Sequence, residues 1–393
     1  MKISTWNQQL IKKENKSIVL QLVKTKSPIS RADIAQQSGL NKGTVSSLVA
    51  ELIKEQLILE TGPGESSGGR RPVMLTFNQS AGSAIGIDLG VNYIRGIITD
   101  LQGNILNQKQ QSYTSSSIEQ TLDHVKANIS HLISEAPSTP YGIVGIGIGA
   151  PGIVDENNDV LLAPNLGWKN SSFKKEIESD FNIPVIIENE ANAGAYGEKM
   201  FGLAKDVNDL VYISAGTGIG TGIIFNGQLY KGSYGFSGEF GHMTMNMNGD
   251  RCRCGNIGCW ELYASEQFLI KRALELNLIE GEEDCVIQVT EKAEASDSKA
   301  ISLLDDIAAH LGMGIVSIVH ALNPKKIIVG NILSGAKKWI ERPVQDYVKK
   351  HAMASLQGEV SIQFSSPFTP STALGVSAFS VEHFLKKTLE DNG

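Results

Sequence analysis

Four side chains in the segment Gly238–Glu261 could bind a metal ion together. They are one imidazole, His242, and three thiols, Cys252, Cys254 and Cys259. Four nitrogen and sulfur ligands suit a closed, tetrahedral zinc site of the structural kind. The two glycines between the last two cysteines let the backbone turn tightly around a metal. The alternative is three reduced cysteines in an ordinary loop, whereas a disulfide is disfavoured in a chain expected in the cytoplasm.

The same segment resembles the signature of the ROK family, which contains sugar kinases and sugar-responsive repressors. The matching patterns are Gly-Glu-x-Gly-His, beginning at Gly238, and Cys-x-Cys-Gly-x2-Gly-Cys-x-Glu, beginning at Cys252. The resemblance implies that Glu239, His242 and Glu261 hydrogen-bond sugar hydroxyls, and that His242 also ligates the zinc. These roles are chemically consistent, because carboxylates accept hydroxyl protons and a metal-bound imidazole keeps its second nitrogen free.

A second part of the sugar site is indicated by the sequence Glu-Asn-Glu-Ala-Asn at residues 188–192. It resembles the Asn-Asp-Ala-Asn segment of ROK kinases, whose Asp is the general base, and so implies that Asn189 and Glu190 contact the sugar. The longer Glu190 side chain moves the carboxylate by about 1 Å, which can cost roughly a hundredfold in rate. The extra methylene also favours a pentose over a hexose. Asn165 is a further candidate for a sugar contact, with an Asx-turn as the equally open alternative.

Two glycine-rich turns resemble the phosphate-binding turns of the same family. The first, Asp88–Asn92, reads Asp-Leu-Gly-Val-Asn where the kinases have Asp-x-Gly-Gly-Thr. Val91 adds a side chain where backbone must approach a phosphate closely, and Asn92 lacks the hydroxyl. The second turn, Gly216–Gly222, keeps its residue types. We therefore expect no ATP cofactor and no enzymatic activity, with residual kinase activity as the alternative.

The N-terminal residues have the pattern of a winged helix-turn-helix. Residues 14–25 are helical in spacing, Ser30 with Asp33 forms a capping box, and Asn41 caps the next helix. Residues 57–60 and 72–77 are predicted strands, and the loop between them would form a wing. The start of a recognition helix reads base edges, and wing arginines contact phosphate or the minor groove. The expected DNA-binding residues are Arg31, Lys42, Gly43, Thr44, Ser46, Ser47, Arg70 and Arg71.

Charge is distributed unevenly along the 393 residues. Residues 1–80 carry a net charge of about +5, whereas the whole chain carries -7. A basic head on an acidic body is typical of a DNA-binding module joined to another domain. We predict an α/β protein with a winged helix-turn-helix at 1–80, followed by a two-lobed actin-like domain. Its lobes would be 81–190 and 191–372, with a last helix at about 373–393 packing back on the first lobe.

The most apolar run noted in the sequence, Ile143–Val154, is short and rich in glycine and proline, so no membrane contact is expected. Within the ROK family, residues 68–73 and the following Gly-Ile-Asp-Leu-Gly-Val resemble the xylose-responsive repressors. The resemblance implies a cytoplasmic repressor that binds operator double-stranded DNA as a homodimer or dimer of dimers and is released by a sugar, with D-xylose as the expected effector. The alternatives are an active ROK sugar kinase and a repressor that responds to glucose or an amino sugar.

Overall fold

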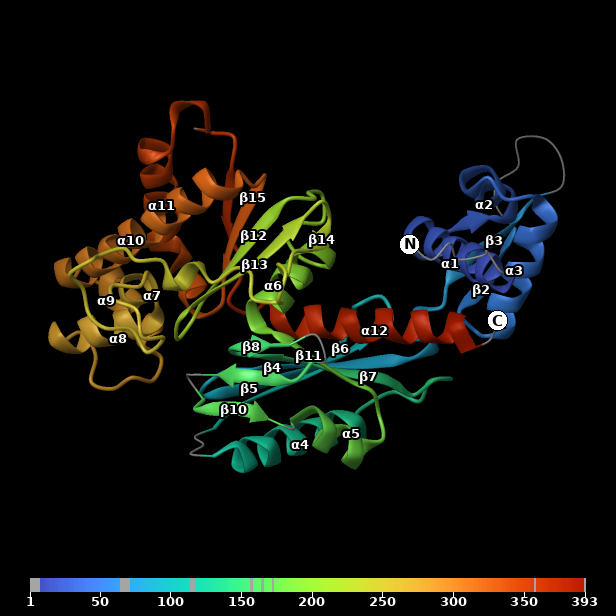
Figure 1. The fold of residues 1–393 in the computed structure, drawn as a ribbon, viewed down its shortest axis with the longest axis horizontal. Coiled ribbons are helices and arrows are strands. Elements are labelled where there is room, and N and C mark those ends of the chain that lie inside the picture. Colours follow the sequence, from blue (N-terminus) through green and yellow to red (C-terminus); the bar gives the residue numbers. More distant parts are fainter. Residues whose placement is uncertain are drawn as a thin grey trace.

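The computed structural model describes residues 8–63, 71–113, 117–155, 158–163, 166–171, 173–356 and 358–391. Residues 8–63 and 71–77 form a head of three helices and a small sheet, shown in blue in Figure 1. Its sheet has the strand order β1-β3-β2 with antiparallel pairing. The elements of the head are α1 (Gln8–Lys26), β1 (Ile29–Ser30), α2 (Arg31–Ser38), α3 (Lys42–Lys54), β2 (Ile58–Pro63) and β3 (Val73–Phe77).

The helix-turn-helix forms as the sequence predicts. The Ser30 hydroxyl accepts a hydrogen bond from the Asp33 backbone amide at 3.2 Å, and the Asp33 carboxylate accepts one from the Ser30 amide at 3.3 Å. Gly39 ends α2 with a φ of +72°, a backbone conformation that glycine adopts readily. The Asn41 side chain then caps α3. The predicted first helix is longer than expected, and the two-residue strand β1 was missed because so short a pairing depends on β3, far along the chain.

Two larger sheets with the same strand order make up the rest of the molecule. Lobe 1 contains the sheet β11-β7-β4-β5-β6, and lobe 2 contains β14-β13-β12-β15-β16. In each sheet three consecutive antiparallel strands are followed by two parallel ones. The lobe 1 strands are β4 (Ser83–Leu89), β5 (Tyr93–Asp100), β6 (Ile105–Ser112), β7 (Ile143–Ala150) and β11 (Val185–Asn189); those of lobe 2 are β12 (Leu210–Ala215), β13 (Ile219–Phe225), β14 (Gln228–Leu229), β15 (Lys326–Gly330) and β16 (Ser361–Phe364).

A repeated sheet of this kind matches the predicted two-lobed, actin-like architecture. A small sheet, β10-β9-β8, extends lobe 1 with strands β8 (Ile153–Val154), β9 (Val160–Ala163) and β10 (Trp168–Ser171). The helices are α4 (Ile118–Ser134), α5 (Phe173–Phe181), α6 (Glu190–Met200), α7 (Glu261–Ala264), α8 (Glu266–Glu275), α9 (Cys285–Glu294), α10 (Ser298–Leu322), α11 (Lys337–His351) and α12 (Ser371–Asp391), with short 3-10 turns at Gln79–Ala81, Phe240–His242, Ile332–Ala336 and Ala354–Leu356.

The last helix, α12, connects the three parts of the molecule. Its first half packs on α6 and on strands β4 and β7 of lobe 1, and its second half lies under the head (Figure 1). Glycines allow the close approach, because a side chain at Gly86 would collide with the Ala373 carbonyl and one at Gly147 with that of Val376. At the other end, Val381, Leu385 and Leu389 are buried in the same apolar cluster as the head residues. The head is therefore not an isolated module in this structure.

Among the described residues, one helix is long and apolar enough to cross a membrane by length and composition alone. It is α10, and half of its most apolar stretch is buried inside lobe 2. Its apolar residues pack in the same cluster as strands β12 and β15 and helix α11. Core helices of folded proteins meet the same criterion, so α10 gives little support for a membrane span.

Candidate functional site

The four predicted metal ligands lie together in lobe 2. His242 ends a short 3-10 turn, and the cysteine loop is held against it by a bridge between Thr244 and Cys259. The ligand atoms of His242, Cys252, Cys254 and Cys259 all lie within 4.8 Å of one another. Two of the separations, His242 Nδ1 to Cys252 Sγ and Cys254 Sγ to Cys259 Sγ, are 3.7 Å.

These distances fit a tetrahedral metal site. With metal–sulfur bonds of about 2.3 Å, two sulfur ligands of one tetrahedral ion lie about 3.8 Å apart. Cys252 and Cys259 are buried and Cys254 is exposed, and the fourth cysteine, Cys285, is buried separately at the start of α9. The four residues can therefore hold a metal ion without rearranging the loop.

The metal-ligand cluster is directly connected to two carboxylates. The Cys252 thiol donates a hydrogen bond to Glu261 Oε1 at 3.0 Å, and the same oxygen lies 3.5 Å from His242 Nδ1. Burial and this bond raise the pKa of the Cys252 thiol. Metal binding removes the thiol proton, which would free the Glu261 oxygen for another donor. On the other side of the imidazole, His242 Nε2 lies 3.8 Å from Glu239 Oε2.

The surroundings of Glu239 shift its pKa in both directions. Partial burial raises the pKa of Glu239, the nearby His242 lowers it, and Glu261 raises it again. Since Nδ1 faces the thiols, the imidazole presents Nε2 to the same side as Glu239. One nitrogen is thus available to a metal and the other to a ligand.

Asn189 and Glu190 lie where β11 of lobe 1 passes into α6. The Asn189 side chain caps α6, because its Oδ1 accepts hydrogen bonds from the amides of Ala191 and Asn192 at 2.9 and 3.1 Å. Its Nδ2 donates to the Gly152 carbonyl at 2.8 Å. Asn189 therefore has a structural role that the sequence analysis did not anticipate. Glu190 is the first residue of the helix, and burial, with a smaller effect from Asp88, raises its pKa to about 8.

Two residues near Glu190 were missed by the sequence analysis. Asp88, the last residue but one of β4, is a buried carboxyl, and the Tyr93 hydroxyl donates a hydrogen bond to its Oδ2 at 3.2 Å. Burial raises the pKa of Asp88 to about 6, while Arg95 and the tyrosine bond lower it. The Tyr93 ring also lies against Gly90, where an added side chain would collide with it. Asp88 is the first residue of the predicted phosphate turn, and a carboxyl at that place was the signal that could have identified this pair.

One cavity of about 640 Å³ joins these groups across both lobes. Lobe 1 contributes Val91, Tyr93 and Glu190, and lobe 2 contributes the turn at 217–221 and the groups around the metal-ligand cluster. The volume is within the range of small-molecule pockets. The sequence-predicted residues on the wall are Asn189, Glu190, Glu239, His242, Cys254 and Glu261, and residues that were not predicted include Trp168, Lys169, Arg253 and Asn331. Asn165 lies outside the described residues.

Five of the eight predicted DNA-binding residues lie at the start of α3. Lys42, Gly43, Ser46 and Ser47 are exposed and Thr44 is partly exposed, while the opposite face of α3 is buried. Arg31 lies on the first turn of α2, where its guanidinium forms an ion pair with Glu60 at 2.8 Å. Arg71 is exposed next to β3. Arg70 and most of the predicted wing lie outside the described residues.

The comparisons with known proteins agree with these features. The family model described as "ROK family" matches residues 84–382. A xylose repressor of Bacillus spizizenii is 44% identical over 379 residues, which cover 96% of this chain and 98% of that protein. A crystal structure of a ROK family transcriptional regulator, a homologue of the Escherichia coli Mlc protein, is 26% identical with a TM-score of 0.81, covering 98% of this chain and 100% of that one. A ROK family glucokinase from Streptomyces griseus, solved with glucose and AMPPNP, is 28% identical with a TM-score of 0.69, covering 76% of this chain and 98% of the glucokinase chain.

Proposed function

The chain belongs to the ROK family, and on that premise we propose that it is a sugar-responsive transcriptional repressor of carbohydrate-utilisation genes. The proposal rests on one observation: the same chain has a surface suited to DNA and, separate from it, a cavity suited to a sugar. The exposed start of α3 suits the major groove of operator DNA, and the inter-lobe cavity has carboxylates and an imidazole that suit hydroxyl groups. Residues 1–80 would be the DNA-binding domain, and 81–190 and 191–372 the two lobes of the sensor.

The effector in this proposal is D-xylose, bound by Glu190 from lobe 1 and by Glu239, His242 and Glu261 from lobe 2. The relatives described as xylose repressors support this choice. So does Glu190, whose carboxyl reaches further into the cavity than an aspartate would. The side-chain oxygen of Asn189 already accepts the hydrogen bonds that cap α6. In this proposal Asn189 therefore acts mainly by holding Glu190 in place.

The metal in this proposal is zinc, held by His242, Cys252, Cys254 and Cys259. When bound, it would fix the imidazole in one tautomer and offset most of the negative charge of the thiolates. His242 Nε2 and Glu239 would offer neighbouring hydrogen-bonding groups, and Glu261, no longer bonded to the Cys252 thiol, would be free to accept from a sugar hydroxyl.

We further propose that the chain does not act as a kinase. Val91 and the Tyr93 ring occupy the first glycine turn, and the Tyr93 hydroxyl engages Asp88. Both features reduce the room for a nucleotide phosphate next to this turn. The second turn, between β12 and β13, is open to the cavity, so an assay of ATP turnover with D-xylose and D-glucose remains the direct check.

The proposed signal is a population shift transmitted through α12. The Thr372 hydroxyl donates a hydrogen bond to the Glu190 carbonyl at 3.1 Å, and the other end of the same helix is buried with the head. A sugar that draws Glu190 and lobe 2 together would act on α12 and hence on the head. In a cytoplasmic homodimer or dimer of dimers, the recognition helices must lie about 34–36 Å apart, or a multiple of that, to occupy successive turns of DNA.

The proposal is tested by fluorescence-anisotropy titration of operator DNA at fixed salt, with and without D-xylose. We expect tight binding that xylose weakens and that L-arabinose does not. Lys42→Ala should weaken DNA binding alone, and Glu239→Gln should abolish the xylose response alone. Glu282→Gln, a change of the same kind outside the cavity, is the matched control. DNA binding that ignores every sugar tested would contradict the proposal.

A further inference from the structure

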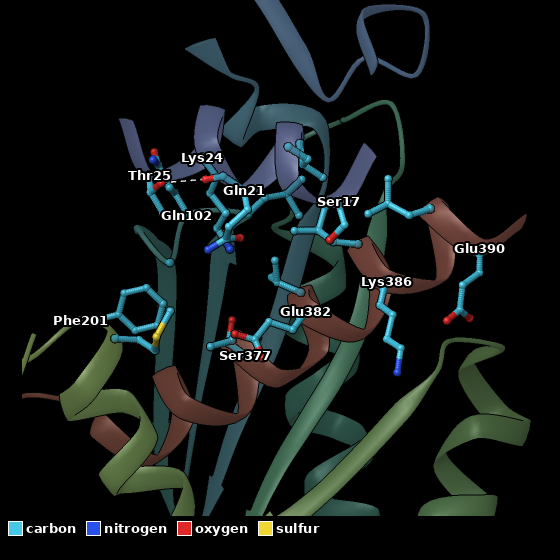
Figure 2. A pocket seen from close by; sticks show the side chains of 18 of the residues that line it. Ser17, Gln21, Lys24, Thr25, Gln102, Phe201, Ser377, Glu382, Lys386 and Glu390 are labelled. Atoms are coloured by element: carbon cyan, nitrogen blue, oxygen red, sulfur yellow. Dashed lines mark hydrogen bonds between the residues drawn. The ribbon is translucent and has the colours of Figure 1, made fainter. Parts of the chain in front are cut away.

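A second and larger cavity lies between the head and lobe 1. This groove has a volume of about 900 Å³ and is lined by α1 on one side and by the second half of α12 on the other. Figure 2 shows Ser17, Gln21 and Lys24 on the α1 side facing Ser377 and Glu382 on the α12 side. Phe201, at the end of α6, and the turn after β5 close one end. Neither the sugar site nor the DNA-binding surface uses this groove.

The walls of the groove favour a ligand with an apolar body. Leu20, Leu101, Val381 and Leu385 line it and are almost completely buried. The Phe201 ring adds a partly buried aromatic wall. The same walls also present polar side chains, among them Ser17, Gln21 and Gln102 (Figure 2), so the groove suits a ligand that has both an apolar and a polar part. A flat or branched apolar body would gain from burial against the apolar side chains.

The groove is also lined by Lys24, whose ammonium group has no nearby carboxylate among the described residues. Within the described part of the chain, no carboxylate oxygen lies within 4.0 Å of Lys24 Nζ, and the ammonium lies over the Phe77 ring, 5.9 Å from the ring centroid. Burial lowers the pKa of Lys24, and the more distant Glu382 raises it. The Glu382 carboxylate already accepts a hydrogen bond from the Tyr196 hydroxyl.

The other charged groups facing the groove leave a small positive excess. Four lysines and three glutamates line it: Lys13, Lys24, Lys205 and Lys386, with Glu14, Glu382 and Glu390. A partly desolvated ammonium in such surroundings attracts an anion more strongly than one at the open surface. A ligand that carries a negative charge next to an apolar body fits these surroundings.

We propose that this groove binds a small organic acid with an apolar body, whose carboxylate or sulfonate pairs with Lys24. The ligand would contact α1 of the head and α12 at once, and so would hold the head against lobe 1. Because the head carries the DNA-binding surface, such a ligand would change the affinity for DNA. The groove would therefore be a second regulatory site, separate from the inter-lobe cavity.

The probe for this site is 8-anilinonaphthalene-1-sulfonate, which has an aromatic body and one sulfonate. Fluorescence titration of the full chain should give saturable binding with one site per chain. Ser17→Trp, which fills the groove from α1, should abolish it, and Lys24→Met should weaken it at least tenfold. Ile18→Trp is the matched control, because Ile18 is the next residue on α1, is 43% exposed and does not line the groove.

Several results would overturn the proposal. These are binding that does not saturate, binding that Ser17→Trp and Ile18→Trp leave equal, an unchanged dissociation constant in both Lys24→Met and Lys24→Gln, and displacement of the probe by D-xylose. Thermal unfolding by circular dichroism identifies any variant that fails to fold. The titration uses no DNA, and D-xylose enters only as a competitor in the displacement measurement, so failure of this proposal and failure of the repressor function proposed above are distinguishable.

Discussion

The hydrogen bond from Thr372 to Glu190 offers the sharpest test of how a sugar signal would leave the cavity. Thr372 lies on the first turn of α12, and its hydroxyl donates to the carbonyl of the first residue of α6 at 3.1 Å. Thr372→Val removes the hydroxyl and keeps a β-branched side chain of similar size. The head is not touched by this change, since Thr372 belongs to the half of α12 that packs on α6 and lobe 1.

The expected effect follows from the usual net contribution of one hydrogen bond. That contribution is about 0.5–1.5 kcal/mol, which corresponds to a factor of about 2–12 in an equilibrium constant. If the bond transmits the signal, the factor by which D-xylose weakens DNA binding should fall by about that amount in Thr372→Val. The affinity for DNA without sugar should stay within about twofold of the original chain.

The assay is an anisotropy titration of operator DNA at several xylose concentrations. Ser380→Ala is the control, because the Ser380 hydroxyl bonds to Val376 within α12 itself, so its loss should leave the xylose effect unchanged. The reasoning is refuted if Thr372→Val responds to xylose like the original chain. It is also refuted if the Thr372 and Ser380 variants lose the response equally.

Three further predictions follow from the site and the head. Removing the metal with a chelator, or replacing Cys259 by Ser, should weaken xylose binding by about 10–100-fold in calorimetry, because supporting ligands of a metal site typically have that effect. In the folded chain the pKa of Glu190 is about 8, above its ordinary value of 4.5, so the stability of the original chain falls as the pH rises from 4.5 to about 8. Glu190→Gln removes this loss, because glutamine does not ionise. The substitution should therefore raise the melting temperature more at pH 8.5 than at pH 5. Leu52→Ala, at a fully buried position of α3, should lower the free energy of unfolding of the head by about 2–5 kcal/mol and abolish DNA binding, whereas the exposed Ala50→Ser should not.

Local signals were sufficient to predict much of this fold. The capping residues Ser30 and Asn41 and the end of α2 at Gly39 gave the helix-turn-helix, because each acts within a few residues of its own position. The four candidate metal ligands could also be predicted from the sequence, since three of them lie in one short loop and His242 is ten residues before it.

Features that depend on distant contacts could not be predicted from the sequence. The hydrogen bond from Asn189 Nδ2 to the Gly152 carbonyl joins two separate loops of lobe 1. The pairing of Tyr93 with Asp88 depends on how the first glycine turn folds back. The groove exists because α1 and α12, from opposite ends of the chain, face each other, and no periodicity within either helix indicates that arrangement.

The central claim, that one chain couples a sugar site to a DNA surface, is tested most directly by reciprocity. The measurement is the dissociation constant of D-xylose for the free protein and for the protein saturated with operator DNA, by calorimetry at one salt concentration. Linkage requires that DNA weaken xylose binding by the same factor by which xylose weakens DNA binding. We predict equal factors, within the typical range of about 5–150-fold for coupled sites. Equal xylose dissociation constants with and without DNA would contradict the account.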